Sequence, residues 1–169
     1  MNGSSRLLIF GGMSLAAFGM LYGLHYAALV EHQTLDHLGG SLTQAFQHAA
    51  NDQPELASRA LETYRQTKYD YVRQVDAHSH WIGLAMIMIV LGAVFERVHF
   101  AERTRQLIAF ALLAGSAIFP LSVILQTYHH DATGLKALAV GSSGLVIAAL
   151  AATAWGFARA NRERLTTND

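Results

Sequence analysis

The chain has 169 residues, of which 52% are hydrophobic and only 14% are charged, so it is more apolar than an ordinary soluble domain. Its 12 basic and 12 acidic residues leave no formal net charge, and no basic stripe is present, which argues against a nucleic-acid partner. The absence of cysteine excludes disulfides, thiolate metal sites and covalently attached c-type haem.

Long uncharged segments dominate the sequence. They cover residues 7–30, 81–95, 107–128 and 137–158. A bilayer core about 30 Å thick is crossed by about 20 apolar residues in a helix. Three segments meet that length, and the second meets it when residues 77–80 extend into the interface. We therefore expect an all-α fold, an integral membrane four-helix bundle in one domain. Its helices are predicted over residues 7–30, 77–98, 105–128 and 135–159.

Two other interpretations of the apolar segments fit less well. A soluble bundle keeps a polar face on each helix, and these helices show almost none. A cleavable signal peptide has an apolar stretch of roughly 7–15 residues. Residues 7–30 form a longer stretch with no clear small-x-small cleavage site at its end. We therefore interpret the first segment as a membrane helix.

Arginines flank these helices on one side. They are Arg6 before the first helix, Arg97, Arg103 and Arg105 between the second and third, and Arg159, Arg162 and Arg164 after the fourth. Positively charged residues mark the cytoplasmic side of membrane helices. The opposite segment 31–79 also contains Arg59, Arg65, Lys68 and Arg73, but it is long and balanced by acids, so it counts less. We expect an integral protein of a bacterial inner membrane, surrounded by lipid, with both termini cytoplasmic and residues 31–79 outside.

The segment 31–79 predicts an outer helical hairpin between the first two membrane helices. The sequence SLTQ at residues 41–44 fits a capping box, and NDQPE at residues 51–55 is a second helix-start signal. An apolar stripe then runs from Ala57 to Val75, and no glycine or proline interrupts the chain before Gly83. The second membrane helix is therefore expected to project outward as one rod beside a shorter helix.

Small residues at a spacing of four predict close helix packing. Gly19 and Gly23 lie on the first membrane helix. The fourth carries a longer series, namely Gly144, Ala148, Ala152 and Gly156. Small side chains let helix backbones approach closely in lipid. We expect both faces to contact other helices.

Histidines form the main functional signal. Of the nine in the chain, only His99 falls on the expected cytoplasmic side. One outer layer contains His25 from the first helix, His78 and His80 from the second, and His129 and His130 from the third. Ionisable groups at membrane depth are costly and usually functional. We expect this layer to bind a cofactor, although interfacial histidines without any ligand are the simpler alternative.

Helical geometry indicates which of these histidines could bind the same cofactor. His78 and His80 point about 200° apart on a helix, so only one of them can face a shared centre. We prefer His80, because Asp76 lies one turn before it and could orient its ring. His25, in a stretch without local charge, is the strongest single candidate for a ligand among all the histidines. The histidines at 129 and 130 would complete or flank the site from the third helix.

Two kinds of centre fit these residue types. Haem b needs one or two axial histidines, an apolar slot and donors for its propionates, which Lys136 or Arg73 would supply. Copper or zinc needs several close imidazoles and acids. The expected metal ligands are His25, His80, His129 and Asp76.

The sequence DAHSHWIGLAMIMIVLG, residues 76–92, resembles the helix start of membrane proteins of the haem–copper oxidase and NnrS type. It is also similar to small uncharacterised four-helix membrane proteins with a His-x-His helix start. In such proteins a His-x-His or a lone histidine opens an apolar helix and helps bind haem or copper. The resemblance covers residues 78–92 and implies haem or copper binding at His78 or His80. The resemblance does not imply an oxidase activity for this chain.

Three functions follow from these features. The first is a cytochrome b-like protein that binds haem b and passes electrons between a membrane quinone pool and an outer acceptor, alone or as a subunit of a respiratory complex. The second is a copper or other metal carrier. The third is a cofactor-free structural subunit that docks a membrane or periplasmic partner through its outer helices. No nucleophile constellation indicates a hydrolase, and no Gly-rich phosphate loop is present.

Overall fold

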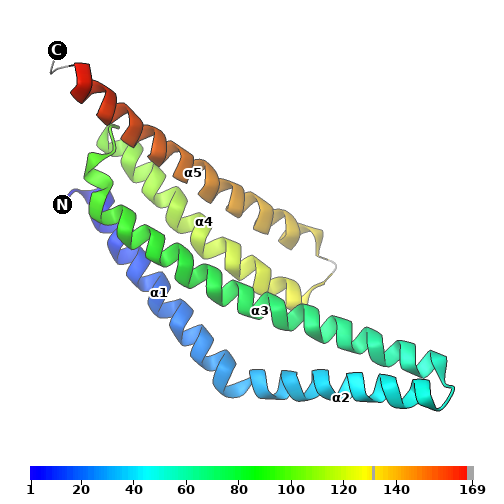
Figure 1. The fold of residues 1–169 in the computed structure, drawn as a ribbon. Coiled ribbons are helices and arrows are strands. Elements are labelled where there is room, and N and C mark those ends of the chain that lie inside the picture. Colours follow the sequence, from blue (N-terminus) through cyan, green and yellow to red (C-terminus); the bar gives the residue numbers. More distant parts are fainter. Residues whose placement is uncertain (131, 167–169) are drawn as a thin grey trace.

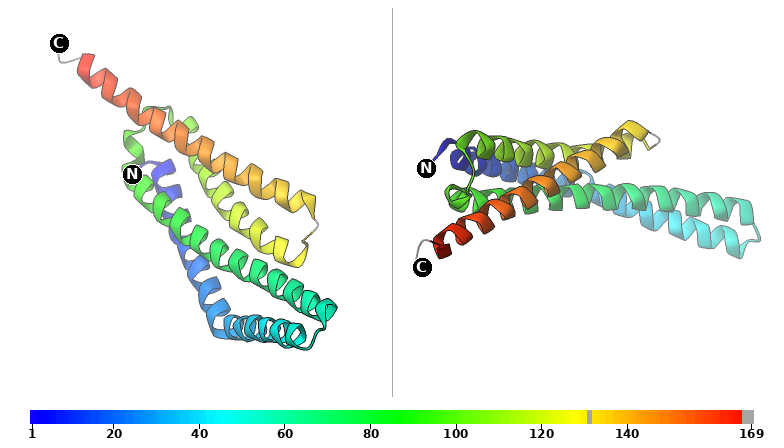
Figure 2. Two further views of the ribbon diagram at one scale, coloured as in Figure 1. Left: turned by 45° about the vertical axis from the view of Figure 1, so that its right-hand side comes forward. Right: turned by 90° about the horizontal axis from the view of Figure 1, so that it is seen from above.

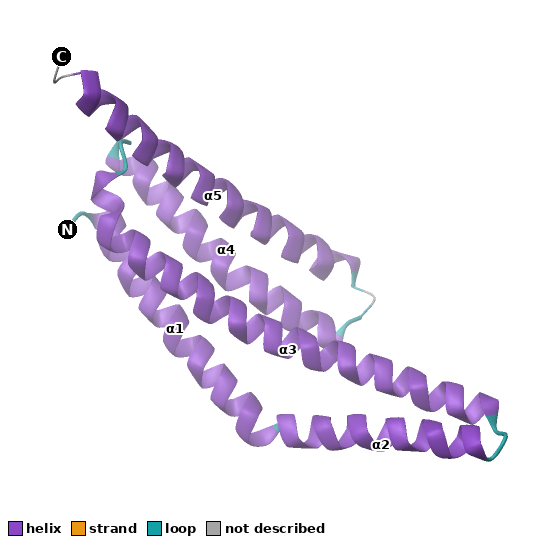
Figure 3. Cartoon of the chain, in the orientation of Figure 1, coloured by secondary structure: helices purple, strands orange, loops and turns teal. Residues whose placement is uncertain are grey.

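A computed structural model describes residues 1–130 and 132–166, with side chains described as far as Arg159. Within these ranges every element is a helix and no strand occurs, which confirms the expected all-α class (Figure 3). The helices are α1 (Gly3–Leu29), α2 (Glu31–Ala50), α3 (Pro54–Val94), the 3-10 helix η1 (Phe95–Arg97), α4 (Glu102–Tyr128) and α5 (Thr133–Thr166). The side chains of Arg162 and Arg164 lie outside the described residues.

Four helices, namely α1, α3, α4 and α5, are long and apolar enough to cross a membrane. They run side by side, and the N-terminus lies at the same end of the molecule as the end of α5 (Figure 1). At the opposite end, α2 and the first half of α3 extend beyond the loop between α4 and α5 (Figure 1). The molecule therefore has a four-helix part and a two-helix extension.

The helix limits differ from the sequence-based ones in the extension. The expected helix start at Ser41 is wrong, because α2 begins at Glu31 and continues through Gly39 and Gly40. Instead of capping, the Ser41 hydroxyl donates to the carbonyl of Leu38 at 3.1 Å. Ser41 and Ala45 are buried in a helix that packs on α3. Packing on α3 accounts for a helix that continues past a glycine pair of low helix propensity.

The turn between α2 and α3 follows local signals. Asp52 has a φ of 53°, the left-handed conformation in which aspartate is among the better tolerated residues. The Gln53 N–H donates to the carbonyl of His48 at 2.9 Å, and α3 begins at Pro54, where the sequence predicts a helix start. From there α3 continues for 41 residues as one helix. The segment expected at 77–98 is therefore the second half of a much longer rod.

The four long helices do not close into a symmetric bundle. In the described part of the chain, α1, α3 and α4 pack on one another, whereas α5 packs along α4 and hardly touches α3. Figure 2 shows α5 crossing the other helices at an angle. Its Val146 and Ala149 join the buried core cluster that contains Leu112 of α4. One side of α5 consequently faces α3 across an open space.

The contact between α1 and α3 depends on glycines. A Cβ atom added to Gly12 would lie 3.0 Å from the carbonyl oxygen of Ala85, and one added to Gly92 would lie 3.1 Å from that of Ser5. Both glycines are buried. The two backbones therefore meet without intervening side chains, which is how helices associate in an apolar environment.

The predicted small-residue faces behave differently. The close packing expected at Gly19 and Gly23 is confirmed, because added Cβ atoms there would meet Trp81 and His78 of α3. On α5 only part of the expected face is used. Gly156 lies against Val98, whereas nothing approaches Gly144 within 4 Å. The part of this α5 face around Gly144 is open, because α3 does not reach it.

Two carboxylates close the end of the bundle where the termini lie. Glu96 accepts from the Asn2 N–H at 2.6 Å, and Glu102 accepts from the Ser4 N–H at 3.0 Å. They bind the free amides of the first turn of α1, where negative charge is favourable. Arg105 pairs with Glu102 at 2.7 Å and so neutralises that carboxylate.

We expect Gly12→Ala to lower the free energy of unfolding by about 1–3 kcal/mol, because the added methyl group overpacks the contact between α1 and α3. The matched control is Gly141→Ala on α5, where nothing lies within 4 Å. That exchange is expected to stabilise the helix by up to about 1 kcal/mol. Thermal unfolding in detergent measures both variants. Equal effects would contradict the close approach of α1 and α3.

Candidate functional site

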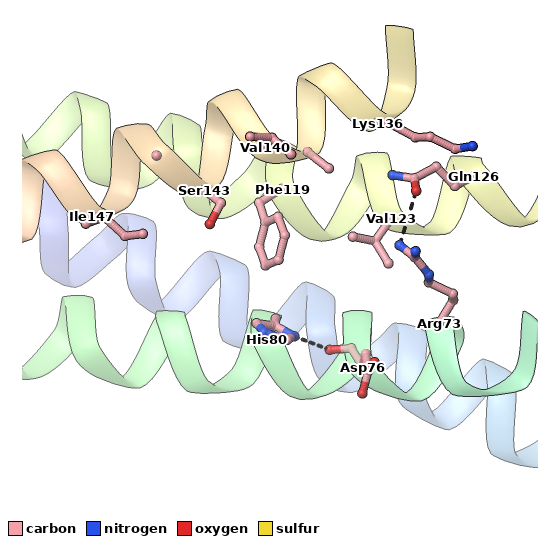
Figure 4. Close-up of a pocket in the computed structure, with 12 residues that line it drawn as sticks. Arg73, Asp76, His80, Phe119, Val123, Gln126, Lys136, Val140, Ser143 and Ile147 are labelled. Carbon is pink, nitrogen blue, oxygen red and sulfur yellow. Dashed lines mark hydrogen bonds between the residues drawn. The ribbon is translucent and has the colours of Figure 1, made fainter. Parts of the chain in front are cut away.

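The open space between α3 and α5, with α4 as its floor, is a cleft of about 590 Å³ (Figure 4). We call it the α3–α5 cleft. It is lined by Arg73, Asp76 and His80 of α3, by Phe119, Val123 and Gln126 of α4, and by Lys136, Ala139, Val140, Ser143, Gly144 and Ile147 of α5. Clefts of about 300–1,000 Å³ with mostly apolar walls and a few polar groups are typical ligand sites.

His80 is the imidazole of this cleft. Its Nδ1 lies 2.7 Å from the main-chain carbonyl oxygen of Asp76, one turn earlier on α3. Because a carbonyl can only accept, Nδ1 carries the hydrogen, and in the neutral imidazole Nε2 is then the nitrogen with the lone pair. The edge-to-face contact with Phe119, with ring centroids 5.0 Å apart, also limits the ring's freedom. His80 therefore presents an oriented nitrogen that could serve as a ligand.

Asp76 contacts His80 through its main-chain carbonyl and not through its carboxylate. Its carboxylate was expected to orient the ring of His80, but the main-chain carbonyl of the same residue makes the hydrogen bond. The spacing explains this, because the carbonyl of residue i−4 lies directly below the side chain of residue i on a helix. The carboxylate remains a polar group of the cleft wall.

His78 faces the opposite way. Its Nδ1 lies 2.9 Å from the carbonyl oxygen of Gly19 on α1. Its ring covers Gly23, where an added Cβ atom would lie 2.4 Å from Cε1 of the imidazole. The predicted angular separation of His78 and His80 is thereby confirmed. His78 joins two helices, whereas His80 opens to the cleft.

Cationic and amide groups gather at one end of the cleft (Figure 4). Arg73 donates to the side-chain oxygen of Gln126 at 3.1 Å and lies over the ring of Tyr69 at 4.7 Å from its centroid. Gln126 is only 3% exposed, and its amide group donates to the carbonyl of Leu135 at the start of α5 at 3.4 Å. Lys136 adds a second positive charge to the lining. The cleft is therefore amphipathic, with a cationic end and apolar walls.

The other predicted histidines lie outside the cleft lining. His25 is an exposed residue of α1, and His129 is an exposed residue at the end of α4. His130 instead pairs with Asp70, with Nε2 and Oδ1 2.9 Å apart, and ties the loop after α4 to α3. The structure therefore brings only His80 of the predicted ligands, together with Asp76, into the α3–α5 cleft.

The expected metal ligands do not assemble. Among the described residues, no three histidine, aspartate or glutamate side chains come together in a way that could hold a metal ion. His25, His80, His129 and Asp76 therefore do not form a metal cluster in this structure. The reason is topological, because α1 contacts the face of α3 that carries His78, whereas His80 points towards α4.

Sequence patterns did not reveal the polar residues that α4 contributes. Besides Gln126, Thr127 accepts from the Gln74 side chain at 2.9 Å, and Gln74 in turn bonds to the Tyr22 hydroxyl of α1. These groups form one polar layer across three helices. The signal in the sequence was a pair of polar residues, Gln126 and Thr127, inside an otherwise apolar segment. Such residues join helices in apolar surroundings.

Comparisons with known proteins suggest no function for the α3–α5 cleft. No family model, curated protein or solved structure matches the chain. The chemistry of the α3–α5 cleft therefore carries the functional argument.

The two histidines of the His-x-His start are expected to differ in their effect on stability. His78→Ala removes a hydrogen bond and a ring between two helices, and should lower the free energy of unfolding by about 1–3 kcal/mol. His80→Ala removes an exposed side chain and should change it by no more than about 0.5 kcal/mol. Thermal or denaturant unfolding in detergent measures both values. A larger loss for His80→Ala would contradict the assignment of the two rings.

Proposed function

We propose that this is an integral membrane protein that binds haem b in the α3–α5 cleft and transfers electrons near the outer face of a bacterial inner membrane. The observation that carries the proposal is the orientation of His80 at the wall of an amphipathic cleft. Its Nδ1 bonds to a carbonyl, and its Nε2 has no hydrogen-bond partner among the described residues. Histidines that ligate metals usually donate their other ring N–H to a carbonyl or carboxylate. When bound, haem b supplies reversible one-electron chemistry at its iron.

The cleft residues fit this group chemically. The apolar side chains of Phe119, Val123 and Ile147 suit a porphyrin face, and Arg73 and Lys136 suit its two propionates. A porphyrin brings four nitrogen ligands of its own, so a single oriented imidazole is sufficient to hold it. A bare copper or zinc ion would need several protein ligands together. The donor set of the cleft therefore supports haem over the copper alternative.

The proposed orientation rests on the distribution of charge. Arg97, Arg103 and Arg105 are close in sequence to Glu96 and Glu102, whose carboxylates bind Asn2 and Ser4 at the N-terminal end of the molecule. Cytoplasmic location of that end follows the positive-inside tendency. The cleft's cationic end and the extension formed by α2 and α3 are then on the outer side, where a quinol could deliver electrons and a periplasmic subunit could accept them.

Exposed apolar side chains on α2 support a protein partner for the outer extension. Phe46 of α2 is 69% exposed and Leu35 on the same helix is 44% exposed. Large apolar side chains on the outer surface favour a docked protein, as the structural-subunit alternative requires. Docking and haem binding are compatible, because the extension and the cleft use different surfaces.

The haem proposal predicts a coloured protein. Purified in mild detergent from cells supplied with haem, the protein should show a Soret band and reduced α and β bands. His80→Ala should lose the pigment, since the only imidazole of the cleft is gone. Arg73→Gln should bind haem roughly tenfold more weakly, as expected for one lost hydrogen bond to a charged group. Absorption spectra and haem titration measure these changes.

His37→Ala, on the exposed surface of α2, is the matched control and should keep the spectrum. His25→Ala should keep the spectrum as well, because His25 of α1 lies outside the lining of the cleft. A colourless wild-type protein that also fails to bind added haem would rule out the proposed function.

The proposed topology is tested with single cysteines in a chain that has none of its own. Ser58→Cys on α3 should react with an impermeant maleimide in intact cells, because it lies in the outer extension. Thr166→Cys should react only after the cells are opened. Labelling of both cysteines from the same side would contradict the orientation.

A further inference from the structure

A second groove lies between α1 and α4, at the end of the molecule that holds the N-terminus. Its volume is about 610 Å³, and its lining consists of Gly3, Leu7, Arg103, Gln106, Leu107 and Phe110. It is separate from the α3–α5 cleft, because the two linings share no residue. We call it the α1–α4 groove.

The lining of the α1–α4 groove changes from polar to apolar along α4. Arg103, Leu107 and Phe110 occupy positions i, i+4 and i+7 of α4, which lie on one face of a helix. Arg103 therefore lies at the start of α4, and Leu107 and Phe110 follow on the same face farther along the helix. Leu107 is 71% exposed and Phe110 is 65% exposed. Such a face has a charged end and a long apolar end.

The positive charge of Arg103 is not neutralised by its acidic neighbour. The Glu102 carboxylate already accepts from the Ser4 N–H at 3.0 Å and pairs with Arg105 at 2.7 Å. Among the described residues, no carboxylate lies within ion-pair distance of Arg103. Arg103 therefore lines the groove without an ion-pair partner among the described residues, and a guanidinium is well suited to bind a phosphate.

Gly3 keeps the mouth of the groove open. A Cβ atom at this position would lie 3.2 Å from the side-chain nitrogen of Gln106. That nitrogen is 3.4 Å from Glu102, a long hydrogen bond that leaves its second hydrogen available to a ligand. The polar end of the groove thus offers two kinds of donor beside each other.

We propose that the α1–α4 groove binds one anionic glycerophospholipid of the cytoplasmic leaflet. The phosphate binds to Arg103 and the Gln106 amide, and an acyl chain lies along Leu7, Leu107 and Phe110. The lining combines a cation that has no ion-pair partner among the described residues with an adjacent apolar face. This combination favours a lipid, since a free phosphate would use only the polar end. The proposal rests on the membrane location proposed above and is independent of the haem.

The test is lipid binding to the delipidated full chain, measured by native mass spectrometry in detergent. Phosphatidylglycerol and phosphatidylcholine with identical acyl chains are compared, and glycerol phosphate serves as a headgroup without chains. Phosphatidylglycerol should bind best, and glycerol phosphate should not bind. Arg103→Gln should weaken phosphatidylglycerol binding about fivefold, the effect of one basic residue at a membrane surface. Phe110→Ala should weaken the binding of this lipid as well.

The matched control is Arg159→Gln, which removes an exposed cation of α5 that does not line the groove. It should leave phosphatidylglycerol binding unchanged. Equal binding of both lipids, equal effects of the two arginine variants, or a dimer that persists in lipid-free detergent and covers the groove would overturn the proposal. Retention of the haem spectrum and of the labelling pattern in Arg103→Gln would separate this outcome from a failure of the proposed function.

Discussion

The close approach of α1 and α3 determines how the rest of the molecule is arranged. Glycines on both helices remove the side chains that would otherwise separate the backbones, and the ring of His78 fills the space above Gly23. Its bond to the Gly19 carbonyl sets the rotation of α3 about its own axis. Because His80 is about 200° away on the same helix, it must then point towards α4. The orientation of the candidate ligand is a consequence of how its neighbour packs.

The second constraint is that polar groups in an apolar bundle must find partners within it. Several of them do so at two levels, whereas Ser5 Oγ, Trp81 Nε1 and Ser116 Oγ are buried without a hydrogen-bond partner among the described residues. Near the outer end, Arg73 bonds to Gln126 and Gln74 bonds to Thr127. At the opposite end, Glu102 joins the start of α1 to Arg105. Each level tethers helices that contact one another between these two ends mainly through small or apolar side chains and the ring of His78.

The position of α5 creates the α3–α5 cleft. This helix packs along α4 and leaves the face around Gly144 open. A symmetric bundle would have buried that face against α3 and removed the cleft. The amide of Gln126, which bonds to the carbonyl of Leu135 as well as to Arg73, holds the outer end of α5 near α3 without closing the gap. An amphipathic space next to one oriented imidazole is the result.

The sequence by itself determined the helical class, the four long apolar helices and the start of α3 at Pro54, because hydrophobic length and proline act locally. It also separated His78 from His80, since their angle depends only on helix geometry. The start of α2 was misjudged, because packing on α3 outweighs the capping signal at Ser41. Only the tertiary structure decided which side chains face His80. Phe119, which contacts its ring, and Ser143, which lines the same cleft, come from distant parts of the chain. No local pattern encodes which faces of three helices will meet.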